Sequence, residues 1–160
     1  MKKLFFVWCG LLLIASCKKD GPQPLPSFEL ITYQHIKSEE VKLSATQIVV
    51  MNSANQYSLK KGAIIFYKTK AGALGKLRIV DNGSVNQSDK LIIDLVNYNP
   101  DGTELLVKAN VQVDINFNFD LDAGLQTLAD ADQSFAFIKI ADGSKIISPE
   151  LGATFKVVTY

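Results

Sequence analysis

Apolar and polar residues alternate most clearly between Leu105 and Leu121, where every odd-numbered position is apolar. After Leu106 every even-numbered position up to Asp120 is polar. Side chains of a β-strand point to opposite faces in turn, whereas a helix would scatter these positions around its axis. We therefore expect a strand whose odd-numbered positions face a hydrophobic core and whose even-numbered positions face water.

This stretch is long for a single strand. At roughly 3.3 Å per residue it would span more than about 50 Å, well beyond the usual strand length. We therefore expect a bulge, strong coiling or a passage from one sheet to another. The sequence 99–102, Asn-Pro-Asp-Gly, predicts a turn that pairs this strand with Lys90–Tyr98. The middle of Lys90–Tyr98 is apolar on both faces, which is typical of a strand covered on both sides.

The rest of the chain predicts short strands separated by turns. Gln34–Glu40 reads as a polar connection, and Leu121–Ser134 is the one stretch with helical spacing. The expected strands are Phe28–Tyr33, Val41–Val50, Gly62–Thr69, Lys76–Val80, Phe135–Ile140, Lys145–Ser148 and Ala153–Tyr160. Together these predict an all-β fold, an antiparallel β-sandwich of about eight or nine strands with at most one short helix. A small closed β-barrel is the alternative.

The N-terminus resembles a secretion signal. Lys2 and Lys3 precede the apolar run Leu4–Ile14, which is too short for a membrane span of roughly 20 residues. The following Ile14-Ala15-Ser16-Cys17 resembles the lipobox of bacterial lipoproteins. That resemblance implies that the signal is cut before Cys17, that the Cys17 sulfur is lipidated and that its new amino group is acylated. Several acyl chains on one residue would anchor the protein durably in a membrane.

The residues after Cys17 indicate which membrane. Position 18 is lysine rather than aspartate, so the chain does not resemble enteric lipoproteins kept in the inner membrane. Lys18-Lys19-Asp20 is similar to the start of mature lipoproteins of the Bacteroidota, some of which are displayed on the cell surface. Gly62–Thr69, followed by Gly75-Lys76-Leu77, also resembles uncharacterised lipoproteins of that group, without implying a function. We expect an outer-membrane lipoprotein, and both the periplasmic face and the cell surface stay open.

These signals divide the chain into three parts. By the lipobox resemblance, residues 1–16 are expected to be the signal peptide. Residues 17–27 are the lipidated cysteine and a tether that holds three of the five prolines. Residues 28–160 are expected to form a single β domain. Removing 16 of the 160 residues leaves 144, enough for one hydrophobic core without covalent cross-links.

Cleavage also changes the composition. The mature chain keeps Cys17 as its sole cysteine and has no tryptophan, which excludes a disulfide framework, thiol catalysis and cysteine metal sites. Two of the 17 basic residues belong to the signal peptide, so the mature chain has 15 basic and 16 acidic residues. A nearly neutral chain whose only arginine is Arg78 argues against a nucleic-acid partner.

Oxygen-bearing side chains on the polar face of the long strand suggest a cation site. They are Asp114, Asn116, Asn118, Asp120 and Asp122. On a straight strand, neighbours on one face lie nearly 7 Å apart and cannot share an ion, so we interpret this series as a solvated face. A weak metal candidate remains at the end of the strand, formed by Asp120, Asp122, Asp130 and Asp132. No cofactor is predicted.

Other candidate chemistry is weaker. His35 is the only histidine and is interpreted as a surface residue, since a metal site needs more ligands than it supplies. Ser58 and Lys61 form an S-x-x-K pair without the partner motifs of penicillin-recognising enzymes. The five tyrosines could stack on sugars, but the missing tryptophan argues against a glycan-binding module. The sequence contains no P-loop, no dinucleotide-binding glycine motif and no G-x-S-x-G motif.

The sequence therefore favours a non-enzymatic lipoprotein whose β domain binds a partner at the cell envelope, either an envelope protein or a glycan. One alternative is a small hydrolase that uses carboxylates at a strand edge. Another is a β-barrel that carries a small apolar ligand in an internal cavity. In each case the bend of the long strand is where we expect a binding surface.

Overall fold

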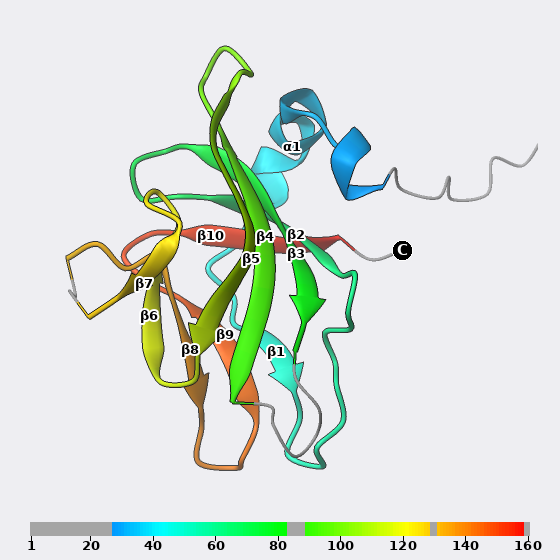
Figure 1. The fold of residues 1–160 in the computed structure, drawn as a ribbon, viewed down its shortest axis with the longest axis vertical. Helices are drawn as coiled ribbons and strands as arrows, with labels where there is room; N and C mark the ends of the chain where they lie inside the picture. The colour runs from blue at the N-terminus through cyan, green and yellow to red at the C-terminus, as the bar shows by residue number, and fades with distance from the viewer. Residues whose placement is uncertain (1–26, 83–88, 129–130, 159–160) are drawn as a thin grey trace, which may run out of the picture.

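Two antiparallel five-stranded sheets pack face to face in the computed structural model, which describes residues 27–82, 89–128 and 131–158 (Figure 1). Sheet A runs in the order β10 (Thr154–Val158), β2 (Ile64–Lys68), β3 (Leu74–Asp81), β4 (Lys90–Tyr98), β5 (Glu104–Asp114). Sheet B runs in the order β1 (Ile48–Met51), β9 (Lys145–Pro149), β8 (Phe135–Lys139), β6 (Phe117–Asp120), β7 (Leu125–Thr127). The predicted β-sandwich is confirmed, and the described residues do not close into the alternative barrel.

The main core fills the space between the sheets. Leu77, Ile79 and Ile93 from sheet A meet Phe119 and Phe135 from sheet B, and each of these side chains is almost completely buried. The Phe119 and Phe135 rings stack with their centroids 5.1 Å apart. Burying such side chains contributes roughly 1.5–3 kcal/mol each, which makes this layer the main source of stability.

A second, smaller core lies on the other face of sheet A. The N-terminal segment η1 (Phe28–Leu30), α1 (Tyr33–Glu39) and η2 (Glu40–Lys42) covers this face (Figure 1). We call residues 28–42 the strap. Its apolar side chains Phe28, Ile31 and Ile36 pack on Phe66 and Val96, among others. This explains why β4 is apolar on both faces, as predicted.

The strap overturns two expectations, because Phe28–Tyr33 is not a strand and Gln34–Glu40 is not an irregular connection. Thr32 is the N-cap residue before α1, and the side chains of Thr32 and His35 cap each other's backbone N–H groups. The His35 Nδ1 lies 3.0 Å from the Thr32 nitrogen. Because only Ile36 of the seven helical residues is buried, no helical stripe of apolar residues marks this segment.

The long alternating stretch passes from sheet A to sheet B, as its length predicted. β5 ends at Asp114 and β6 begins at Phe117, with Asn116 between them in the left-handed region at φ 64°. The Asn-Pro-Asp-Gly turn joins β4 to β5 as a hairpin, also as predicted, and Gly102 takes a φ of 89° there.

The prediction that every odd-numbered position faces the core is wrong for the first half of β5. Ile93 pairs with Val111 and Leu95 with Lys108, so β5 holds an extra residue at Asn110, whose φ is 53°. This bulge moves the following residues to the opposite face. Val111 and Val113 contact the main core, whereas Val107 lies opposite Val96 on the outer face and is 57% exposed.

The expected helical turn in Leu121–Ser134 is also wrong. The chain makes a turn after β6 and returns as β7, which pairs with β6. The Asp120 carboxylate accepts the backbone N–H groups of Asp122 and Ala123, at 2.8 and 3.2 Å, and this fixes the turn. Leu128 is 84% exposed, so the spacing that suggested a helix does not mark a buried face.

Candidate functional site

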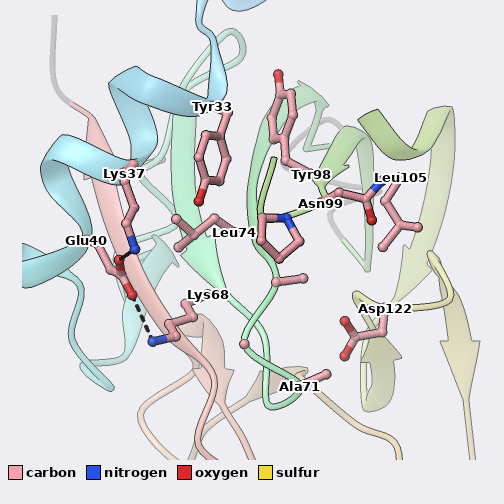
Figure 2. Close-up of a pocket in the computed structure, with 13 residues that line it drawn as sticks. Tyr33, Lys37, Glu40, Lys68, Ala71, Leu74, Tyr98, Asn99, Leu105 and Asp122 are labelled. Carbon is pink, nitrogen blue, oxygen red and sulfur yellow. Dashed lines mark hydrogen bonds and ion pairs between the residues drawn. The ribbon is translucent and has the colours of Figure 1, made fainter. Parts of the chain in front are cut away.

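A hollow of about 460 Å³ opens where four segments meet at one end of sheet A (Figure 2). They are the strap, the β2–β3 turn, the β4–β5 turn and the turn after β6. We call this the main hollow. Its size suits a small ligand, since binding pockets commonly measure roughly 300–1,000 Å³.

One wall of the main hollow carries a three-residue ion cluster. Glu40, at the start of η2, accepts Lys37 Nζ at 2.6 Å and Lys68 Nζ at 2.8 Å, each on a different carboxylate oxygen. Hydrogen bonds from these two ammonium groups lower the pKa of Glu40 to about 2. Glu40 in turn raises the pKa of Lys37. Glu40 therefore stays ionised at neutral pH, and the two lysines and one glutamate of the cluster sum to a formal charge of one positive unit.

Aromatic and apolar side chains form the upper part of the main hollow. The rings of Tyr33 on the strap and Tyr98 on β4 lie with centroids 6.1 Å apart. The Tyr98 hydroxyl donates to the Ile31 carbonyl at 3.2 Å, whereas the Tyr33 hydroxyl points into the hollow (Figure 2). Gly102 lies against the Tyr33 ring, where a Cβ would come within 3.4 Å of it. The β4–β5 turn and the strap thus hold Tyr33 between them.

The opposite wall carries an acidic side chain. Asp122 follows β6, and Figure 2 shows its carboxylate turned toward the hollow from the side away from the lysines. Its backbone position is set by the bond to the Asp120 carboxylate. Gly124 lets this turn pack on the inner side of β5, since a Cβ there would lie 2.9 Å from Leu106. The main hollow therefore has a basic side and an acidic side that are each built by local geometry.

A second hollow of about 340 Å³ adjoins the first, and Ala71 and Asp122 line both. We call it the side hollow. Asp120 and Asp132 also line it, together with Lys70, whose Nζ donates to the Ala131 carbonyl at 3.3 Å. The end of the long alternating stretch, at Asp120 and Asp122, lies beside this acidic hollow. The bulge at Asn110 and the passage between sheets at Asn116 line neither hollow, so the expectation of a binding surface at the bend stays a prediction.

The structure brings together part of the predicted metal candidate. Asp120, Asp122 and Asp132 line the side hollow, but Asp130 lies outside the described residues. Within the described ranges, no group of three or more histidine, cysteine, aspartate or glutamate side chains is arranged to hold a metal ion. The four-residue site stays a prediction.

The other sequence candidates lie away from the hollows or outside the described part. His35 is exposed and caps α1. Ser58 and Lys61 lie in the exposed connection before β2. Tyr67 is buried, as is typical of sheet packing, and Cys17 is not among the described residues.

The lysine side of the main hollow was not predicted from the sequence. Lys37 and Glu40 are three residues apart, a spacing that indicates contact only when the segment is helical. Lys68 joins them through the fold of the strap over sheet A. Of the residues that line this hollow, the sequence singled out Asp122, as part of the metal candidate, and Tyr33 and Tyr98, among the tyrosines that could stack on sugars.

No protein-family model matches the chain, and no curated protein or solved structure is significantly similar to it. Among the described residues, no helix is long and apolar enough to cross a membrane.

Proposed function

We propose that this protein is a non-enzymatic binding module that is anchored in the bacterial outer membrane by lipid on Cys17. The anchor rests on the lipobox-like residues 14–17, and the tether 17–27 would separate the domain from the membrane. This anchor is compatible with a domain in the periplasm and with a domain displayed on the cell surface.

The single observation that carries the binding role is the main hollow. It is a preformed concave site with a mostly apolar interior and a few converging charged groups, which is the usual composition of a ligand pocket. Its two lysines are held in place by the protein itself, because Glu40 forms an ion pair with each of them. A site of this kind loses little side-chain freedom on binding, which favours affinity.

Anchoring is tested by expressing the full chain in a bacterial host with an alkyne-labelled fatty acid. We expect the label on the wild-type chain and its loss in Cys17→Ala, with the protein moving from the outer-membrane fraction to the soluble fraction. Cys9→Ala, which changes the signal peptide instead, is the matched control and should keep the label. An unlabelled wild-type chain would refute the anchor.

A hydrolase that uses carboxylates at a strand edge remains the alternative from another class. It requires at least two acidic groups in one pocket, and Asp120, Asp122 and Asp132 line the side hollow. One Asp120 oxygen is already bonded to two backbone N–H groups of the turn. This engagement favours a structural role for Asp120, and therefore the binding function over the catalytic one.

A further inference from the structure

We propose that the main and side hollows together bind a short peptide with free ends, its carboxylate at the lysines and its ammonium group at the aspartates. This inference rests on the proposed binding function and names the class of ligand. It follows from the opposite charges on the two walls, the apolar surface between them and the continuity of the two hollows at Ala71 and Asp122.

The lysine wall is suited to a carboxylate. Each ammonium group has three N–H donors, and Glu40 accepts one from Lys37 and one from Lys68. The remaining donors are free to bind a ligand, since the two side chains are 51% and 41% exposed. Glu40 holds the two ammonium groups close together despite their repulsion, so that a single carboxylate could contact both.

The aspartate wall is suited to an ammonium group. Among the described residues, no basic side chain forms an ion pair with Asp122 or Asp132. Three carboxylates line the side hollow against one lysine, Lys70, which donates to a backbone carbonyl. This side therefore attracts a cation that the protein itself does not supply.

The surface between the two walls is suited to an apolar side chain. Leu105 is 57% exposed and lines the main hollow, as do Pro100 and Leu74. A ligand side chain placed there would cover Leu105 at a gain of roughly 25 cal/mol per Å² of apolar surface removed from water.

The balance of charge selects among ligand classes. The charged residues of the main hollow, Lys37, Lys68, Glu40 and Asp122, carry no net charge in total. The side hollow adds one negative unit through Lys70, Asp120 and Asp132, so the two hollows together favour a ligand with separated charges. A ligand with only negative charge would be repelled by Asp122, and one with only positive charge would be repelled by the lysines. A short peptide with free ends satisfies both walls.

The test uses the full chain in detergent and isothermal titration with three tripeptides. They are Ala-Leu-Ala with free ends, its N-acetylated form and its C-amidated form. We expect the free-ended peptide to bind at least fivefold more tightly than either blocked form, and the preference to shrink at high salt. No binding of the free-ended peptide, or equal affinity for all three, would overturn the proposal.

Two variants then assign each peptide end to its wall. Asp122→Asn should lower the affinity for the free-ended peptide at least fivefold and leave the affinity for the N-acetylated peptide unchanged. Lys68→Met should lower the affinity for the free-ended peptide and leave the affinity for the C-amidated peptide unchanged. Asp142→Asn and Lys61→Met remove charges at positions that line neither hollow. They are the matched controls and should leave the affinity for all three peptides unchanged. Equal losses for every peptide would contradict the assignment.

The two proposals fail in distinguishable ways. In one outcome the peptides do not bind, but an envelope extract yields another ligand whose binding is weakened by Lys68→Met. The binding function then stands and the ligand class is wrong. If no ligand from the extract responds to either hollow variant, the binding function is refuted together with the ligand class. The fatty-acid label reports on the anchor independently of both.

Discussion

Tyr67 lies so close over Gly75 that a Cβ at position 75 would come within 2.3 Å of the tyrosine ring. The two residues face each other across β2 and β3. The tyrosine hydroxyl donates to the side-chain oxygen of Asn97 at 2.6 Å, and the Asn97 amide donates to the Leu121 carbonyl at 2.6 Å. Gly75 thus makes room for a buried polar chain that links sheet A to the turn beside the hollows.

Gly75→Ala should destabilise the fold by about 1–3 kcal/mol, since the added methyl group forces the Tyr67 ring out of its position. Urea unfolding measures the loss. The cause is checked by repeating the substitution in a Tyr67→Leu background, where it should cost less because the ring is absent. An equal cost in both backgrounds would show that the ring is not the reason.

Lys76→Met should loosen the strap. The Lys76 ammonium group is buried, donates to the carbonyls of Phe28 and Ile31 at 2.6 Å each, and lies 4.6 Å from the centre of the Phe28 ring. Losing two charged hydrogen bonds should cost about 2–4 kcal/mol. Lys76→Met should increase the rate of hydrogen exchange more in residues 28–42 than in β8 and β9. Lys61→Met, an exposed lysine, is the control and should leave exchange unchanged.

Stability should fall in acid partly through Glu40. Its pKa of about 2 in the folded chain is below the ordinary value of 4.5, so the unfolded chain takes up the proton at a higher pH. The contribution of Glu40 is therefore complete above about pH 4.5 and is lost as the pH falls toward 2. Thermal unfolding of Glu40→Gln and wild type from pH 7 to pH 2 should show curves that converge in acid. A constant difference at every pH would contradict this.

Asn110→Val should destabilise the β5 bulge by about 1–2 kcal/mol, because a β-branched residue tolerates the left-handed conformation poorly. Asn110 has a φ of 53°, and its N–H donates to the Asp94 carboxylate at 2.8 Å. Gln112→Val places the same residue in the same strand at an exposed position outside the bulge and should be nearly neutral. Chemical denaturation compares the two. Equal effects would show that the bulge geometry does not matter.

The layers of the fold follow from the sequence, whereas the faces of its longest strand do not. Period-two alternation and turn residues were enough to predict a sandwich, and the length of the long stretch predicted a bulge, coiling or a passage between sheets without placing it at Asn116. The bulge at Asn110 depends on the pairing of β4 with β5 and on a contact with Asp94, which no local pattern reveals. Alternation alone therefore placed Leu105 and Val107 on the wrong face.

The hollow was harder to predict because its parts come from separate segments. α1 has seven residues and one buried apolar side chain, so its sequence resembles a polar loop. Lys37 and Glu40 become neighbours through that helix, and Lys68 reaches them from β2. The acidic side was anticipated only as the end of the long strand, since Asp120 and Asp122 stood in its alternating series.

The strap also has a mechanical consequence. If the chain is anchored through Cys17, tension on the tether enters the domain at Phe28, where Lys76 passes the load to β3 inside sheet A. Tyr33, Lys37 and Glu40 belong to the same strap and form one side of the main hollow. A pull strong enough to peel the strap from sheet A would remove that side and release whatever the hollow holds. The lipid anchor and the binding site would then be coupled by force.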